Sequence, residues 1–174
     1  MVLIVLISLI FSLDQDPLLS TRYEKKVRKG VEKALDLSDT DLKRVGHGNS
    51  ELYSIKTEGD LKGYLLLAEV AACNLGGCPA YDMIKKDKSS EYFDMMLITD
   101  KDRNILSVSI LDYFSDYGYE ITAKSYLKKF KGKNICDFAN ESDGIDAVSG
   151  ATISSYALEG TLALLCDQFE YASH

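Results

Sequence analysis

Small residues and hydroxyl-bearing residues gather in one stretch near the C-terminus, and their order suits phosphate binding. Residues 143–155 read Asp-Gly-Ile-Asp-Ala-Val-Ser-Gly-Ala-Thr-Ile-Ser-Ser. A Gly-Ala pair between two hydroxyl residues leaves little side-chain bulk, so a ligand can come close to the backbone. The residues that could line such a site are Asp146, Ser149, Gly150, Ala151, Thr152, Ser154 and Ser155.

A long helix is expected directly after this stretch. Residues 153–171 contain no proline and one glycine, and their apolar side chains recur at helical spacing. These side chains are Ile153, Ala157, Leu158, Leu162, Leu165, Cys166 and Phe169. The first turn of such a helix has free N–H groups and the positive end of the helix dipole, which favour an anion. The alternative is that Thr152, Ser154 or Ser155 simply caps the helix.

The sequence of this stretch resembles a known family signature. Residues 146–152, Asp-Ala-Val-Ser-Gly-Ala-Thr, resemble the Asp-x-x-(Ser/Thr)-Gly-Ala-Thr signature of the FMN-binding domain family. This family includes the flavin-carrying C and G subunits of the sodium-pumping quinone reductase and of Rnf-type complexes. In the family a separate flavin transferase attaches FMN to the last threonine by a phosphoester bond. The resemblance implies FMN on Thr152, an α+β fold with an antiparallel sheet and flanking helices, and redox donor and acceptor proteins as partners.

The resemblance covers roughly residues 60–166. Gly-Tyr at 63–64, Gly-Gly at 76–77, a turn at Asp100 and the segment 108–111 follow the order seen in these domains. Where better-known members have Glu-Thr-Pro-Gly near the flavin ring, residues 115–120 read Ser-Asp-Tyr-Gly-Tyr-Glu. Tyr117 or Tyr119 could stack on the isoalloxazine ring. The resemblance adds these residues to the candidate cofactor site: Gly76, Gly77, Gly118 and Tyr119. Because this turn differs from the family pattern, a binding domain that carries no flavin is an alternative.

The composition indicates one globular domain with a short extension. The chain has 174 residues and a net charge of −7, and this charge disfavours a general nucleic-acid role. Residues 1–20 are expected to form an apolar signal-like or anchor-like segment, and 21–174 the FMN-binding domain. The apolar run 1–13 is shorter than a full membrane span and fits an export signal better. We therefore expect an exported, periplasmic or membrane-anchored protein with the domain outside the cytoplasm.

Apolar patterns predict strands at 51–56, 61–72, 93–99 and 105–113, with a hairpin through 100–104. Ser107 and Ser109 alternate with apolar residues, which indicates a sheet face that meets solvent. Helices are expected at 22–37 and 119–130, and a short strand at 135–136. In the first helix Tyr23, Val27, Val31, Ala34 and Leu35 form an apolar side, whereas Lys25, Lys26, Arg28, Lys29 and Lys33 lie elsewhere. These basic residues indicate a solvated face or, alternatively, contact with anionic lipid.

Four cysteines permit several interpretations. Cys73 and Cys78 bracket the Gly-Gly turn. They could form a structural disulfide after export, exchange electrons with the flavin, or serve as the active pair of a thiol-disulfide protein. Cys136 and Cys166 are expected to be core residues. The two histidines lie far apart in the sequence, so no metal site is predicted.

Overall fold

The computed structural model describes residues 19–45, 50–71, 91–116, 118–139 and 145–172, and its centre is an antiparallel sheet. The strands are β1 (Asp41–Arg44), β2 (Glu51–Thr57), β3 (Asp60–Ala71), β4 (Tyr92–Asp100) and β5 (Ile105–Phe114). They lie in chain order, and each pairs antiparallel with the next. The four predicted strands are confirmed within one or two residues of each end, and so is the α+β class.

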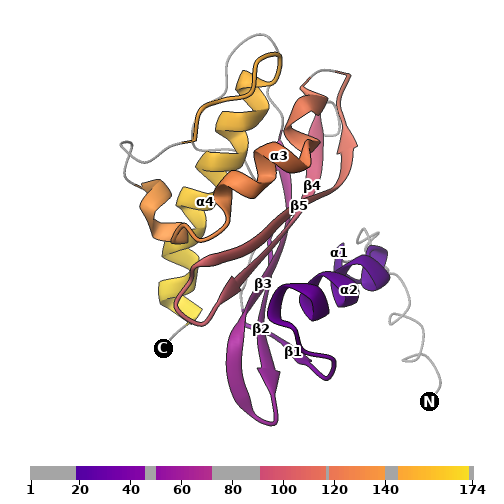
Figure 1. Ribbon diagram of the computed structural model, residues 1–174, viewed down its shortest axis with the longest axis vertical. Helices are drawn as coiled ribbons and strands as arrows, with labels where there is room; N and C mark the ends of the chain where they lie inside the picture. Colours follow the sequence, from indigo (N-terminus) through magenta and orange to yellow (C-terminus); the bar gives the residue numbers. More distant parts are fainter. Residues whose placement is uncertain (1–18, 46–49, 72–90, 117, 140–144, 173–174) are drawn as a thin grey trace, which may run out of the picture.

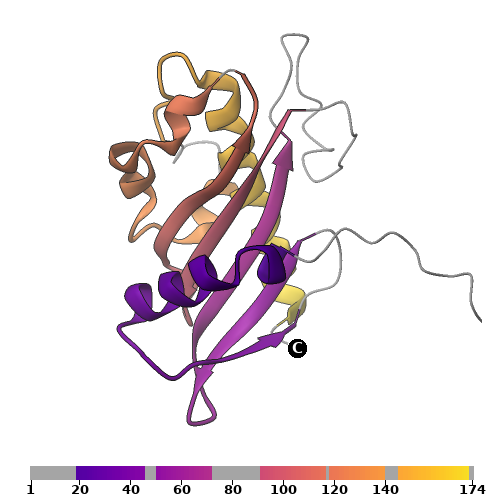
Figure 2. The same cartoon turned by 90° about the vertical axis from the view of Figure 1, so that its right-hand side faces the viewer.

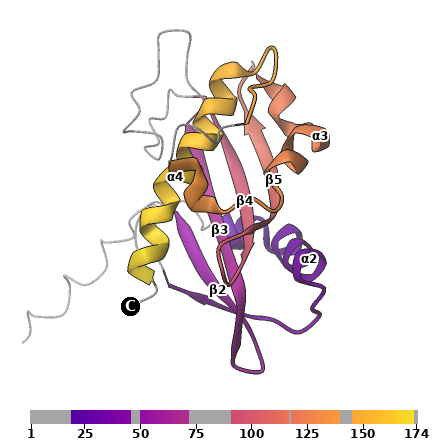
Figure 3. The same ribbon diagram turned by 60° about the vertical axis from the view of Figure 1, so that its left-hand side comes forward.

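Helices cover both faces of this sheet (Figure 1). On one face lie α1 (Leu19–Arg22) and α2 (Glu24–Leu35). On the other face lies the long α4 (Thr152–Ala172), and Figure 3 shows it running along the strands. Beside α4 pack the short elements η1 (Tyr119–Thr122), α3 (Lys124–Leu127), η2 (Lys128–Phe130) and η3 (Ile135–Ala139). Within the described part of the chain, no helix combines the length and the hydrophobicity that crossing a membrane requires.

The two covered faces explain why β3 is apolar without interruption. Leu65 and Leu67 pack in the core under α2, whereas Leu66 and Ala68 pack in the core under α4. Neighbouring side chains of a strand point to opposite faces, so both sets must be apolar when both faces are covered. The serines of β5 pair with Met96 and Ile98, which belong to the α2 side. They are half-buried there, so this face of the sheet meets solvent only in part at these positions.

Two buried carboxylates attach α1 and α2 to the sheet. The carboxylate of Glu51 accepts hydrogen bonds from the backbone N–H groups of Leu19 and Ser20. Asp94 accepts one from the Tyr23 hydroxyl at 2.6 Å and one from the Arg22 guanidinium at 3.3 Å. Burial raises the pKa of the Asp94 carboxyl. The predicted apolar side of this helix is confirmed, since its side chains form the core between α2 and the sheet.

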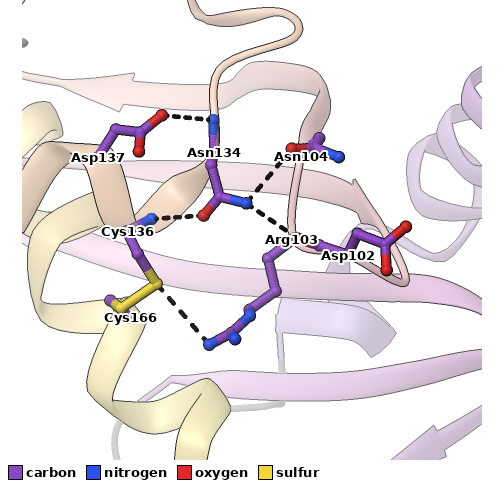
Figure 4. Close-up of a disulfide and its surroundings, with 7 residues drawn as sticks. All are labelled: Asp102, Arg103, Asn104, Asn134, Cys136, Asp137 and Cys166. Carbon is purple, nitrogen blue, oxygen red and sulfur yellow. Dashed lines mark hydrogen bonds between the residues drawn. A yellow bond between two sulfur atoms is a disulfide. The ribbon is translucent and has the colours of Figure 1, made fainter.

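The predicted helix 119–130 is present only in pieces, because Ala123 adopts an extended conformation between η1 and α3. The predicted strand at 135–136 is wrong, since these residues begin the 3-10 helix η3. Asn134 fixes this segment: its side-chain oxygen accepts from the Cys136 N–H at 3.1 Å, and its amide donates to the Asp102 carbonyl at 2.9 Å (Figure 4).

The cysteines Cys136 and Cys166, which we predicted only as core residues, form a disulfide that joins η3 to α4 (Figure 4). The guanidinium Nη1 of Arg103 lies 3.8 Å from the sulfur of Cys136. The β4–β5 turn, η3 and α4 are therefore connected to one another by this group of residues.

Candidate functional site

The segment that leads into α4 is held by two side chains of the helix itself. The hydroxyl oxygen of Ser155 accepts a hydrogen bond from the Val148 N–H at 3.2 Å. The carboxylate of Glu159 accepts one from the Ile145 N–H, also at 3.2 Å. Residues four apart lie on the same side of a helix, so these two acceptors hold the segment along α4. Burial raises the pKa of the Glu159 carboxyl.

A tight turn then places Thr152 at the surface as the first residue of α4. The N–H of Ala151 donates to the Val148 carbonyl at 2.9 Å, and the Ala151 carbonyl accepts from the Ser155 N–H at 2.9 Å. Gly150 has a φ of +87°, a conformation that glycine adopts without strain. Ala151 is buried, whereas Thr152 is exposed. The turn thus anchors its alanine in the core and presents its threonine to solvent.

The serines of the first turn do not cap α4. Ser154 is buried, and its hydroxyl lies 2.9 Å from that of Tyr113, while Ser155 binds Val148 as described. Among the described residues, no serine or threonine side chain accepts a hydrogen bond from the N–H groups of Thr152 or Ile153. The first turn of an α-helix leaves these groups without intrahelical acceptors. As far as the described residues go, they therefore remain available to an anion beside Thr152.

Gly118 and the start of η1 pack against this turn, and both contacts occur at glycines. Gly118 has a φ of +80°, and a Cβ there would lie 2.6 Å from the Ser154 oxygen. A Cβ on Gly150 would lie 3.1 Å from a carboxylate oxygen of Glu120. Loop 118–120 and the start of α4, which are distant in the sequence, are thus in direct contact.

Exposed apolar side chains surround the same helix terminus. Ile153 is 37% exposed, although its helical spacing predicted burial, and Tyr156 is 61% exposed. Tyr119 is 67% exposed, and its ring meets that of Tyr113 edge-on at 5.8 Å. Such side chains offer contact area to a flat ring system.

The structure brings most of the sequence-predicted site residues together. Asp146, Ser149 and Thr152 are exposed, whereas Ser154 and Ser155 are buried and already engaged. Gly76, Gly77, Tyr117 and the pair Cys73 and Cys78 lie outside the described residues. Sequence reasoning missed Tyr113, Glu120 and Glu159, since no local pattern marks a residue that reaches the site through the fold.

The described residues fit the phosphate end of FMN. The exposed Thr152 lies at the first turn of α4, where no described serine or threonine side chain caps the N–H groups, and the small residues Gly150 and Ala151 precede it. Exposed aromatic rings for the flavin are nearby. A second observation comes from comparison with known proteins: residues 90–163 match the family model of the FMN-binding domain. No match was found among curated proteins. The matched segment contains Thr152 and both contacting loops, so the chain carries an FMN-binding domain of this family over residues 90–163.

Proposed function

We propose that this protein is an electron carrier whose FMN is esterified to Thr152. The observation that carries the proposal is the exposed position of Thr152 as the first residue of α4, within the matched segment. A phosphodiester keeps a negative charge next to the attachment oxygen. The free N–H groups and the helix dipole stabilise that charge.

Attachment requires an external enzyme. The Thr152 oxygen forms a bond to the phosphorus of the flavin mononucleotide unit and loses its proton. The same phosphorus loses its bond to the leaving group of the donor nucleotide. A threonine hydroxyl is a weak nucleophile without an adjacent base. Within the described residues, no side chain accepts a hydrogen bond from this hydroxyl, so a flavin transferase has to supply the base.

The side chains around Thr152 would then hold and shield the prosthetic group. Tyr119, Ile153 and Tyr156 provide the exposed apolar area against which a flavin ring can pack. The Glu120 carboxylate near Gly150 adds a negative charge. This charge would disfavour the gain of further negative charge by an FMN bound nearby. When bound, FMN supplies transfer of one or two electrons, and the protein tunes its potential through contacts of this kind.

We also propose that the domain works outside the cytoplasm. The disulfide between Cys136 and Cys166 supports this location, because disulfides persist in oxidising compartments. The apolar run at residues 1–13 agrees with it. A covalent link also suits such a location, because FMN lost outside the cell could not be replaced from the cytoplasmic pool.

The test is production of the full chain together with an active flavin transferase. We expect a fluorescent flavin band on a denaturing gel, and a Thr152 peptide heavier by one FMN less one water. Thr152→Ala should abolish both signals. Ser125→Ala, which removes another exposed hydroxyl from α3, should abolish neither. Colourless wild-type protein with an unmodified Thr152 peptide, or a flavin that persists in Thr152→Ala, would contradict the proposal.

A further inference from the structure

The exposed face of α2 carries positive charge that the fold does not use. Lys26 is engaged, since its Nζ donates to the Leu111 carbonyl at 2.7 Å and lies over the Tyr23 ring. Arg28 pairs with Glu24 at 3.5 Å. Lys25, Lys29 and Lys33 are exposed, and among the described residues none of the three forms an ion pair.

These three lysines form a stripe, because residues at i, i+4 and i+8 follow one another along a single side of a helix. We call them the lysine stripe. Like charges four residues apart repel, so the arrangement costs some helix stability. Glu32 lies one turn from Lys29 and makes no ion pair in the described part of the chain. Folding requires only the opposite, apolar side of α2, so the stripe has no structural function within the described fold.

The charge of α2 is also opposite to that of the whole chain. The helix has five basic and two acidic residues, hence a net charge of +3, in a chain of net charge −7. The remainder of the chain therefore carries −10. An anionic surface would repel most of this molecule and attract α2. Charge segregation of this kind fixes the orientation of a docked protein.

We propose that the lysine stripe docks the domain on anionic lipid head groups. A straight stripe on a helix that lies flat across the sheet suits a planar surface (Figure 2). The apolar run at residues 1–13 precedes α1 closely in the sequence, so a lipid surface is favoured over an acidic protein. The apolar side of α2 is buried against the sheet, so the contact is electrostatic and needs no insertion into the lipid.

Docking through α2 would leave the flavin site accessible. Thr152 begins α4, and α4 covers the face of the sheet opposite to α2 (Figures 1 and 2). A soluble redox partner could then reach the exposed side chains at the start of α4 while the domain stays on the membrane.

The test uses the full chain and flotation with phosphatidylcholine vesicles, with and without phosphatidylglycerol, at low and high salt. Two triple variants are compared: Lys25→Gln, Lys29→Gln, Lys33→Gln on the stripe, and Lys124→Gln, Lys128→Gln, Lys131→Gln on the other side of the sheet. Both remove the same charge from exposed positions. Because residues 1–13 could bind any vesicle, the measured quantity is the preference for anionic over neutral vesicles.

We expect wild-type protein to prefer anionic vesicles at low salt and to lose this preference at high salt. Each lysine near an anionic membrane strengthens binding about fivefold. The preference for anionic vesicles should therefore be roughly a hundredfold smaller in the stripe variant, which lacks three lysines. The control variant should lose little. Equal losses in the two variants, or no preference in wild-type protein, would overturn the proposal. Unchanged vesicle binding together with lost binding to an acidic protein would overturn it too and would indicate a protein partner.

Discussion

Replacing Gly118 by alanine tests how closely loop 118–120 packs on the start of α4. The left-handed conformation of Gly118 costs an alanine about 1–2 kcal/mol. The added Cβ would lie 2.6 Å from the Ser154 oxygen and 2.8 Å from the Tyr113 oxygen. It must displace this hydrogen-bonded pair, which adds an overpacking cost of about 1–3 kcal/mol. We therefore expect the free energy of unfolding to fall by about 3 kcal/mol in total.

Gly59 and Gly132 provide matched controls for this measurement. They have φ values of +88° and +85°, but a Cβ on either would meet no atom within 4 Å. In their alanine variants the free energy of unfolding should fall only by the cost of the left-handed conformation, about 1–2 kcal/mol. Urea unfolding followed by circular dichroism measures the loss of unfolding free energy in all three alanine variants relative to wild type. For a chain of this length the Gly118 variant should also melt roughly 10 °C lower than wild type.

The Gly118 variant should load flavin less well than the two controls when produced with a flavin transferase. Displacing Ser154 moves the first turn of α4, and Thr152 is part of that turn. If Gly118→Ala costs no more stability than Gly59→Ala, and loads flavin like wild type, the direct contact between the two loops is refuted.

Three further variants test other parts of the structure by urea unfolding. Replacing Cys136 and Cys166 together by alanine should cost about 3.5 kcal/mol, the loop-closure value for a separation of 30 residues. Reducing agent should then lower the midpoint less than it does in wild-type protein. Burial raises the pKa of Glu159, so the native state binds this proton more tightly than the unfolded chain does. Its contribution to stability therefore falls as pH rises from the ordinary carboxyl pKa through the raised one, and Glu159→Gln should remove that slope. Gly63→Ala should cost at least about 3 kcal/mol, because its Cβ would lie 2.1 Å from the rigid carbonyl oxygen of Thr99.

The sequence predicts those elements whose signal is local. Strands β2 to β5 and helices α2 and α4 follow from apolar periodicity, and their observed ends lie close to the predicted ones. The β4–β5 hairpin follows from its turn residues: Asp100 accepts hydrogen bonds from the Asp102 and Asn104 N–H groups, each at 2.9 Å. Such bonds are made within a few residues, so residue type alone reveals them.

The wrong predictions concern contacts between distant residues. Ile135 and Cys136 have the residue types of a strand, yet the disulfide to α4 and the hydrogen bond from Asn134 to the Asp102 carbonyl hold this segment as a 3-10 helix. In the site, the stretch 146–152 could be recognised because its residues are contiguous. Tyr113 and Glu120 could not, because they reach that stretch only through the packing of β5 and η1 against it.

The matched segment 90–163 should not fold by itself. It would leave β4 without β3, its partner along the register from Gly63↔Asp100 to Ala71↔Tyr92. The core that supports α4 also contains β2 and β3 side chains, namely Leu52, Leu66, Ala68 and Val70. Cys166 lies beyond residue 163, so the fragment would lose the disulfide as well. We expect a fragment of residues 90–163 to lack cooperative unfolding by circular dichroism, in contrast to the full chain. A sharp thermal transition in the fragment would show that the flavin site needs neither the first three strands nor the end of α4.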